Sequence, residues 1–373
     1  MDRLPEPRRR MRLLFLVSDA FGGHGGISRF NRDLAAALSA SPDVRELVIL
    51  PRRAPHPPGP LPPRTVQRAA PPGKLGFAGA ALREAAGGFD VVICGHINLM
   101  PVAVLARRMA GKLARRGRPA RLALVIHGVD AWTPVKVPGL SSVDMTIAVS
   151  RYTLDRFRNW SDIAAGRGTV LPNTVDLSVF TPGPRPAALE ERYGVAGARV
   201  LMGLARLDAM DRDKGFYELL AVLPRLAERE PGLRYLLCGD GTDRPSLEAE
   251  VRRLGLTERV VFTGFVPEEE KADHYRLADA FALCGRQEGF GIVLLEAMGC
   301  GVPVVASRVD GSREAVLDGA IGELADPGDP DDLAGALQRA LATPRPCVPD
   351  LLAPSFGRDA FVWRVWDVLS HLA

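Results

Sequence analysis

The chain has 373 residues, of which 47% are hydrophobic and 25% charged. This composition is ordinary for a soluble globular protein and excludes a fibrous or largely disordered chain. At about 100–200 residues per domain, two domains are expected. Five cysteines, at positions 94, 238, 284, 300 and 347, form no C-x-x-C pair and no zinc-type set with histidine, as is typical of a reducing cytosol.

The net charge of +4 conceals an uneven distribution. Residues 1–178 hold 26 Lys and Arg against 13 Asp and Glu (+13), and the remainder holds 22 against 31 (−9). Two explanations fit: the basic half meets an anionic partner, such as nucleic acid, a membrane surface or a phosphorylated substrate, or the arginine excess only aids solubility. The polar first residues do not resemble a secretory signal, and no apolar run reaches the roughly 18–20 residues that span a bilayer. We therefore expect a cytoplasmic protein whose membrane contact, if any, is peripheral.

In the first half, short apolar runs alternate with helix-like stretches. Strands are predicted at MRLLFLVSDA (11–20), ELVILP (46–51), DVVICGH (90–96), RLALVIHG (121–128) and MTIAVS (145–150). A helix is predicted at ISRFNRDLAAALSA (27–40), and the Pro- and Arg-rich residues 51–73 predict a long loop. Strands that are apolar on both faces, with helices between them, are typical of a parallel sheet.

The pattern breaks at LPNTVDLSVFTPGPRP (171–186), which we interpret as an interdomain linker. Five more strands are then predicted, at RVLMGLAR (199–206), LRYLLCGD (233–240), VVFTGF (260–265), DAFALC (279–284) and VPVVAS (302–307). Helices are predicted at 216–230 and 243–255, and the last stretch, 356–373, predicts an amphipathic helix whose Trp363 and Trp366 share the face that packs on a domain.

The fold class that follows is α/β, with two doubly wound Rossmann-like domains facing each other across a deep cleft. The domains are predicted at 1–176, with the helix 356–373 packing back on it, and at 177–355. Ligands of such sheets bind beyond the carboxyl ends of the strands.

Two glutamates, Glu288 and Glu296, lie in the segment EGFGIVLLE. Gly289 and Gly291 predict a tight turn before a helix. Glu296 lies in an apolar run, where a carboxylate needs a hydrogen-bond donor, and the ribose hydroxyls of a nucleotide would serve. The backbone N–H groups of the turn and the positive end of the helix suit a diphosphate.

This segment resembles the E-x7-E motif of the family-4 glycosyltransferases (glycosyl transferases group 1), which have the GT-B fold. In that family the first glutamate contacts the donor sugar and the second the nucleotide ribose, and the resemblance implies these roles for Glu288 and Glu296. It also implies donor contacts at the turn and helix start, from Phe290, Gly291 and Ile292.

Arg206 and Lys214 lie in ARLDAMDRDKGF (205–216), at the end of a predicted strand and in the loop after it. Both can neutralise a diphosphate and stabilise the departing nucleoside diphosphate. The family's R-x-n-K-G pattern matches here with a slightly longer insert. Asp211-Arg212-Asp213 is formally a metal-binding D-x-D, but it lies between the two cations, and we interpret it as a coincidence that requires no metal.

The loop Gly22-Gly23-His24-Gly25-Gly26 follows the first predicted strand. It is not G-x-G-x-x-G, so a dinucleotide fingerprint is not supported. Gly25, Gly26 and Arg29 resemble the family's GG-x-x-R element, which serves the donor phosphates and the acceptor. His127 ends a predicted strand, and the resemblance implies a hydrogen bond from it to the donor sugar and support for charge separation. Asp130 is expected, like Arg29, to contact the acceptor.

Three further segments compare with the family. Pro172-Asn173-Thr174-Val175-Asp176 matches its P-N-G-V-D linker, with Thr174 in place of Gly. Gly239-Asp240-Gly241 matches its G-x-G loop near the nucleobase, which implies a donor contact at Gly241. Cys284-Gly285-Arg286 departs from the usual Pro-Ser before the E-x7-E motif, so different local contacts are expected there.

The resemblance implies a retaining, metal-independent hexosyltransferase with no cofactor. The donor would be a UDP- or GDP-hexose, with glucose or mannose, bound by 177–355, and a saccharide or lipid-linked acceptor would be bound by 1–176, with no nucleic acid as partner. The front-face mechanism proposed for the family uses the leaving phosphate as base, which suits a chain without a pair of acid–base carboxylates in its acceptor half.

We expect a role in bacterial cell-surface polysaccharide or glycolipid biosynthesis, with the basic half docking at the cytoplasmic membrane face. Three alternatives stay open. One is another GT-B enzyme, a sugar-nucleotide epimerase or a phosphorylase, although no lysine has the context of a pyridoxal Schiff base. Another is a nicotinamide oxidoreductase, which would need G-x-G-x-x-G. The third is a non-catalytic nucleotide-sugar-binding protein, against which the intact E-x7-E argues.

Overall fold

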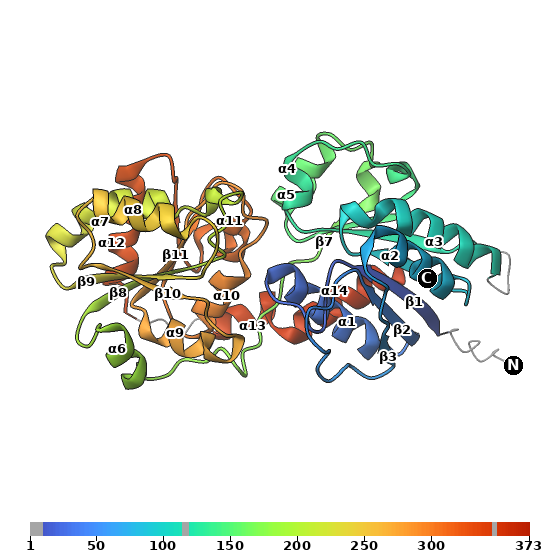
Figure 1. Cartoon of the computed structure of the whole chain (residues 1–373), viewed down its shortest axis with the longest axis horizontal. Helices are drawn as coiled ribbons and strands as arrows, with labels where there is room; N and C mark the ends of the chain where they lie inside the picture. Colours follow the sequence, from blue (N-terminus) through green and yellow to red (C-terminus); the bar gives the residue numbers. More distant parts are fainter. Residues whose placement is uncertain (1–9, 114–118, 345–348) are drawn as a thin grey trace, which may run out of the picture. The chain divides into compact units, whose positions relative to one another are not determined.

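The computed structural model describes residues 10–113, 119–344 and 349–373. The chain divides into two compact units: unit one is Met1–Asn173 with Phe361–Ala373, and unit two is Thr174–Ala360. Figure 1 shows the course of the chain through each unit. Within the described residues, no helix combines the length and the apolar character needed to cross a bilayer.

Unit one is built on a seven-stranded parallel sheet with the order β3-β2-β1-β4-β5-β6-β7. The chain runs β1 (Met11–Val17), α1 (Gly26–Ala40), β2 (Val44–Pro51), β3 (Thr65–Gln67), α2 (Gly73–Ala85), β4 (Val91–Cys94), α3 (Met100–Leu113), β5 (Arg121–Ile126), α4 (Val129–Trp132), β6 (Met145–Ala148), α5 (Arg151–Arg158) and β7 (Gly168–Val170). Helices α2 and α3 pack together over one face of the sheet, against side chains such as Leu14 and Val92.

The end of the chain returns to unit one. In α14 (Arg358–Ser370), Phe361 packs edge-on against Phe30 of α1, and the indole N–H of Trp366 donates to the carbonyl of Ala37 at 3.0 Å. The expectation that both tryptophans pack on a domain is wrong for Trp363, which is 69% exposed and whose one described ring contact is a T-shaped contact with Trp366.

Unit two has a six-stranded parallel sheet with the order β10-β9-β8-β11-β12-β13. The chain runs α6 (Ala187–Tyr193), β8 (Arg199–Leu204), α7 (Phe216–Arg229), β9 (Leu233–Cys238), α8 (Arg244–Arg253), β10 (Val260–Gly264), α9 (Lys271–Leu277), β11 (Ala280–Leu283), α10 (Ile292–Gly299), β12 (Val304–Ser307), α11 (Ser312–Ala315), β13 (Glu323–Ala325), α12 (Pro330–Ala342) and α13 (Pro349–Phe356).

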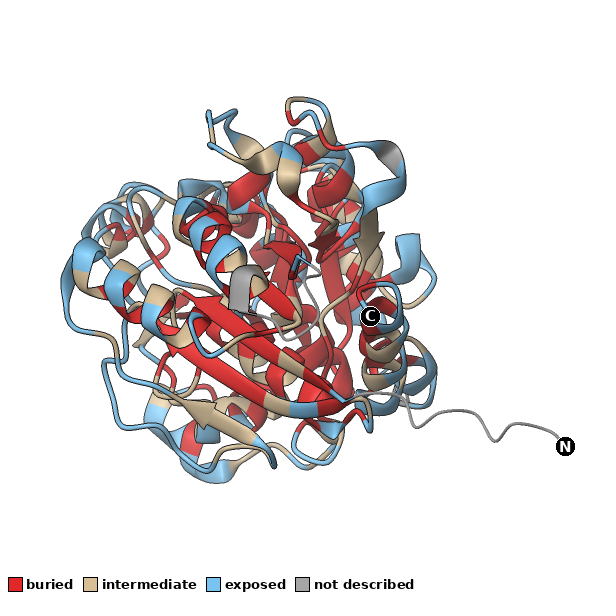
Figure 2. Ribbon diagram, turned by 90° about the vertical axis from the view of Figure 1, so that its right-hand side faces the viewer, coloured by how far each residue is buried: buried red, intermediate tan, exposed pale blue. Residues whose placement is uncertain are grey.

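The central strands of both sheets are buried on both faces, as their apolar sequences predict (Figure 2). Residues Leu13–Val17 of β1 have no exposed surface. The predicted fold class of two doubly wound parallel α/β halves is confirmed. The predicted loop 51–73 was partly wrong, because it contains the short edge strand β3, which follows Arg64 in a left-handed conformation (φ 56°).

Thr174 occupies the place where the family pattern has Gly. Its hydroxyl donates to the carbonyl of Phe356 at 2.8 Å, and the N–H of Val175 donates to the same carbonyl at 3.0 Å. Asp176 pairs with Arg358 at 2.8 Å. The substitution thus ties the start of unit two to the end of α13 in the same unit.

Candidate functional site

In unit two the sheet reverses its direction of growth between β8 and β11. The connection from β8 leads to β9 on one side, whereas β11 continues to β12 on the other. In open α/β sheets ligands bind beyond the carboxyl ends of the strands at such a switch point. Arg206 and Lys214 follow β8, and Glu288 follows β11, so the fold brings the predicted cations and the first glutamate to one place.

Lys214 and Glu288 form an ion pair across this switch point. The Lys214 Nζ lies 3.0 Å from Glu288 Oε2 and 3.6 Å from Asp211 Oδ2, and the side chains of Lys214 and Glu288 are 16% and 21% exposed. Burial lowers the pKa of Lys214, but the charges of Glu288 and Asp211 outweigh it and leave the pKa raised. Burial likewise acts to raise the pKa of Glu288, but Lys214 and nearby N–H groups keep it below its ordinary value. Both groups are therefore charged at neutral pH.

The second oxygen of Glu288 binds the turn before α10. Its Oε1 accepts the backbone N–H groups of Gly289, Phe290 and Gly291 at 3.0, 3.3 and 3.1 Å. The expectation that this turn offers uncommitted N–H groups to a diphosphate is therefore wrong for these three residues. A phosphate that used them would have to displace the Glu288 carboxylate.

Arg206 differs from Lys214 in being open to solvent. Its side chain is 72% exposed, with its guanidinium 3.7 Å from Asp208 and 3.9 Å from Asp211. Burial raises the pKa of Asp211, while Lys214 and Arg206 act to lower it. The first aspartate of the D-x-D thus faces the two cations. Within the described residues, no three His, Cys, Asp or Glu side chains are grouped as a metal site.

The loops after β8 and β11 are locked together through their backbones. A Cβ on Gly215 would lie 2.1 Å from the carbonyl oxygen of Cys284, and one on Gly285 would lie 2.1 Å from that of Asp213. The N–H of Arg286 donates to the same Asp213 oxygen at 2.9 Å. At 284–286, where the family has Pro-Ser, the backbones of the two loops therefore approach each other closely. This contact holds the Lys214 loop against the Glu288 loop.

The loop that contains Gly241 packs on the same β8 loop. Leu207 N–H donates to the Asp240 carbonyl at 3.0 Å, and Asp243 N–H donates to the Leu207 carbonyl at 2.8 Å. The buried Asp243 carboxylate accepts from Arg212 at 2.6 Å and from the Tyr217 hydroxyl at 3.0 Å. These bonds fix the shape of the loop, and Arg212 serves this purpose rather than facing Lys214.

Glu296, on α10, is 2% exposed and has partners within the protein. The hydroxyl of Tyr275 donates to its Oε2 at 2.8 Å, and Lys271 Nζ lies 3.8 Å from the same oxygen. The buried carboxylate therefore does not depend on a ligand for its hydrogen bonds, contrary to the argument made from the sequence. Its ribose contact stays a prediction. Tyr275 and Lys271 were missed because they lie 21 and 25 residues away on α9.

In unit one the switch point lies between β1 and β4. The glycine loop follows β1, and α1 begins at Gly26, directly after Gly25. Arg29 pairs with Asp33 at 3.1 Å along the same helix. Arg32, which the sequence reading missed although it is one turn further on, donates to the carbonyl of Gly23 at 2.8 Å and holds the loop.

His127 follows β5 at the same sheet edge. Its Nε2 lies 2.9 Å from the carbonyl oxygen of Gly95, which can only accept, so Nε2 carries the proton. Burial lowers the pKa of His127, against the opposing charge of Asp130, so the ring is neutral at pH 7. Asp130, 3% exposed, accepts the backbone N–H of His127 at 3.0 Å and lies 3.2 Å from His96 Nε2. His96 was missed, although it follows a predicted strand as His127 does.

Comparison with known proteins identifies the family. A family model described as "Glycosyl transferases group 1" matches residues 204–348, and one described as "Glycosyltransferase Family 4" matches residues 24–179. A GDP-mannose-dependent alpha-(1-6)-phosphatidylinositol monomannoside mannosyltransferase of Mycobacterium tuberculosis is 32% identical over 287 residues, 72% of this chain and 71% of that protein. The chain belongs to the family-4 glycosyltransferases.

Two further similar proteins support this membership. The protein of the same name from Mycolicibacterium smegmatis is 38% identical over 252 residues, which span 64% of this chain and 65% of the relative's length. The crystal structure of Anabaena Alr3699/HepE in complex with UDP and glucose has a TM-score of 0.77 at 22% identity, covering 97% of this chain and all of that one. The GT-B fold implied by the E-x7-E segment is thus confirmed.

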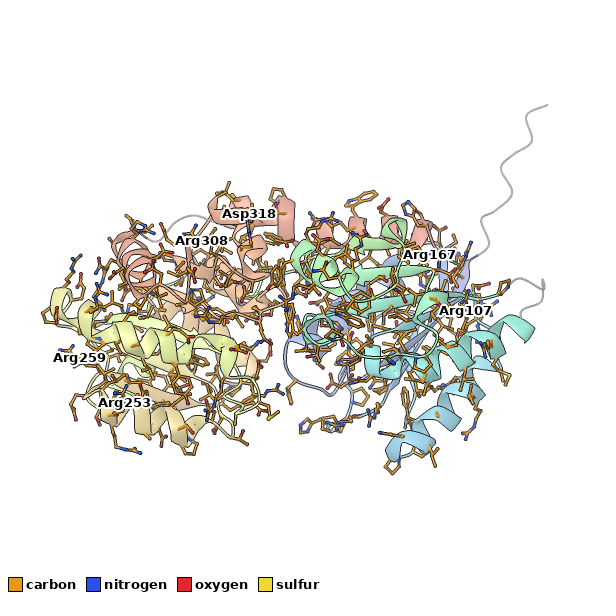
Figure 3. The ribbon with its side chains drawn as sticks, turned by 90° about the horizontal axis from the view of Figure 1, so that it is seen from above. Arg107, Arg167, Arg253, Arg259, Arg308 and Asp318 are labelled. Atoms are coloured by element: carbon orange, nitrogen blue, oxygen red, sulfur yellow. The ribbon has the colours of Figure 1, made fainter. Side chains whose placement is uncertain are left out.

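The basic character of the first half of the chain has a partly structural explanation. Arg107 donates to the carbonyls of Ala120 and Ser142 at 2.8 and 2.6 Å, and Arg167 donates to those of Ser141 and Val143 at 3.3 and 3.1 Å. Figure 3 labels both arginines in unit one. Part of the arginine excess therefore satisfies loop carbonyls at the ends of strands.

Proposed function

We propose that this chain is a retaining hexosyltransferase that moves mannose or glucose from a nucleotide diphosphate sugar to a saccharide or lipid-linked acceptor. The observation that carries the proposal is the Lys214–Glu288 pair at the switch point of the unit-two sheet, with the exposed Arg206 beside it. Because the chain belongs to the family-4 glycosyltransferases, we interpret this pair as part of a site for a donor diphosphate and its sugar.

The pair supplies two opposite functions at one place. The Lys214 ammonium and the Arg206 guanidinium can bind the donor diphosphate and stabilise the charge that grows on it as the sugar leaves. The Glu288 carboxylate can accept hydrogen bonds from sugar hydroxyls. Because Arg206 is 72% exposed and only loosely paired, it can turn toward a phosphate at little cost. The neutral His127 can accept a hydrogen bond from a sugar hydroxyl through Nδ1.

The names of the relatives support a choice of donor and acceptor. Two carry GDP-mannose and phosphatidylinositol monomannoside in their names, and the Anabaena structure holds UDP and glucose. We therefore propose a GDP- or UDP-hexose as donor and a glycolipid or related saccharide as acceptor, in bacterial polysaccharide or glycolipid biosynthesis. Transfer with retention, the leaving phosphate acting as base, no requirement for a metal, and a cytoplasmic site with peripheral membrane contact complete the proposal.

A transfer assay tests it. The purified protein is incubated with GDP-mannose, UDP-glucose or ADP-glucose and with phosphatidylinositol monomannoside, with and without EDTA, and the anomeric configuration of any product is read by NMR. We expect transfer from one donor, an α-linked product from an α-donor, and full activity in EDTA. Lys214→Ala should reduce transfer roughly 100-fold, whereas Arg253→Ala, which removes an exposed cation on α8 of the same unit, should not.

Each result can count against a different part. No transfer from any donor, with no thermal shift by UDP or GDP, would remove the proposed function. An inverted product would remove retention, and inhibition by EDTA would remove metal independence. Equal activity of Lys214→Ala and wild type would remove the role of the ion pair.

A further inference from the structure

The segment after β12 holds the backbone of Glu288 on both sides. Asp310 Oδ2 accepts the N–H of Glu288 at 3.0 Å, and the N–H of Gly311 donates to the Glu288 carbonyl at 2.9 Å. A Cβ on Gly311 would lie 2.2 Å from the carbonyl oxygen of Gly289, so only glycine permits this approach. Both peptide groups that flank the Glu288 Cα are thus bound by two consecutive residues from another loop.

Asp310 is itself held rigidly. It has no exposed surface, and its Oδ1 accepts the N–H and the hydroxyl of Ser312 at 2.9 and 2.6 Å. The Ser312 Oγ in turn accepts the N–H of Ser307, the last residue of β12, at 3.0 Å. No ion pair involves Asp310 within the described part of the chain, so its carboxylate acts as a hydrogen-bond acceptor. A rigid strand end is thereby connected to Glu288.

We propose that Asp310 is a positioning residue for sugar transfer, which fixes the main chain of Glu288 so that its carboxylate stays between Lys214 and the start of α10. The inference rests on the proposed function, in which Glu288 contacts the donor sugar. The physical basis is that a shift of the Glu288 backbone displaces its carboxylate by a similar distance. A misplacement of about 1 Å can reduce a rate roughly 100-fold.

The protonation state of Asp310 decides whether this arrangement holds. The ionised carboxylate accepts all three N–H and O–H donors, whereas protonation turns one oxygen into a donor that opposes an N–H group. The groups whose charge or titration bears on Asp310 are Glu288, Lys214 and the Cys284 thiol. Burial raises the pKa of Asp310 to about 7, against the hydrogen bonds of Ser312 and Glu288, which lower it. The positioned form therefore gains population as the pH rises through neutrality.

Three variants test the inference in the transfer assay with the donor that wild type uses. Asp310→Asn keeps the size of the side chain but places an amide where an acceptor is needed, and Ser312→Ala removes one donor to Asp310. The control is Asp318→Asn, an exposed aspartate of the same unit that Figure 3 labels at its surface. Kinetic constants for the donor, the Kd for its nucleoside diphosphate and the pH profile of kcat from pH 5.5 to 8.5 are measured.

We expect wild-type kcat to rise through a midpoint near pH 7. Asp310→Asn should lower kcat about 10–100-fold, abolish that midpoint, and change the Kd for the nucleoside diphosphate less than about threefold. Ser312→Ala should move the midpoint to higher pH, because the lost hydroxyl favours the charged carboxylate. This second variant decides the matter if Asp310→Asn fails to fold.

The results that would refute the positioning role of Asp310 differ from those that would refute the proposed function. If wild type transfers sugar but folded Asp310→Asn keeps its kcat and its pH profile, the positioning role is refuted and the enzyme assignment stands. A loss confined to nucleoside diphosphate affinity, with kcat intact, would also refute it. Absence of transfer by wild type would instead remove the proposed function itself.

Discussion

The Lys214–Glu288 pair permits a quantitative prediction about stability. Lys214→Met removes the ammonium but keeps the length of the side chain, and it leaves Glu288 Oε2 without its partner at 3.0 Å. Breaking a buried ion pair from one side costs about 3–5 kcal/mol. Because the side chains are 16% and 21% exposed and Oε1 keeps three N–H donors, we expect the low end, about 3 kcal/mol.

Substitution of the other partner of the pair should destabilise the protein less. Glu288→Gln retains an acceptor for the three N–H groups, and Lys214 keeps Asp211 at 3.6 Å, so we expect a loss of about 1 kcal/mol. The double variant leaves neither charge unpaired. A double-mutant cycle in urea, followed by circular dichroism at pH 7, should therefore give a favourable coupling of about 1–3 kcal/mol.

The pH dependence has a defined sign. A carboxylate with a lowered folded-state pKa contributes stability above its unfolded pKa of about 4.5, and this is lost as the pH falls through the folded value. Repeating the cycle at decreasing pH should reduce the coupling as Glu288 becomes protonated. Additive single and double variants at pH 7, within about 0.5 kcal/mol, would refute the reasoning.

Three further predictions concern the surroundings of this pair. Gly285→Ala should cost about 1–3 kcal/mol in chemical denaturation, because its Cβ meets a carbonyl oxygen at 2.1 Å, whereas Gly232→Ala, with open space around it, should not. Tyr275→Phe should weaken UDP or GDP more than pyrophosphate in titration calorimetry if Glu296 binds ribose; equal effects would contradict that role. Burial raises the pKa of Asp310 to about 7, so ionisation of Asp310 should cost the folded protein about 4 kcal/mol in total as the pH rises from about 4 to 7, and the stability of wild type relative to Asp310→Asn should fall by that amount over this range.

The sequence predicts the interior of both sheets better than their edges. The long apolar runs correspond to β1, β2, β4, β5 and β6 in unit one and to β8 to β12 in unit two. The strands that were missed are β3, β7 and β13, each three residues long and each at the end of its sheet. Such a strand is paired on one side only and half buried, so it needs no apolar pattern.

At the site, likewise, the sequence predicts the motif residues better than the residues that surround them. Lys214 and Glu288 are 74 residues apart, yet both lie in loops that follow predicted strands, and the order of a doubly wound sheet brings such loops together. The partners of Glu296 could not be predicted in this way, because Tyr275 contacts it from a helix face whose sequence is that of ordinary core. Asp310 was overlooked although it follows a predicted strand, because a single Asp in a loop is also typical of a turn.

The arginines of unit one bear on the proposed membrane contact. Arg12, Arg64, Arg107 and Arg167 direct their guanidinium groups to backbone carbonyls, so these groups are committed to loops rather than presented to a phosphate. Hydrogen bonding to a carbonyl does not remove the charge, however, and the +13 balance of residues 1–178 still creates a positive field. Such a field attracts an anionic surface over about 8–10 Å at physiological salt. The membrane contact proposed above would therefore be a salt-sensitive attraction that needs no site for a particular headgroup.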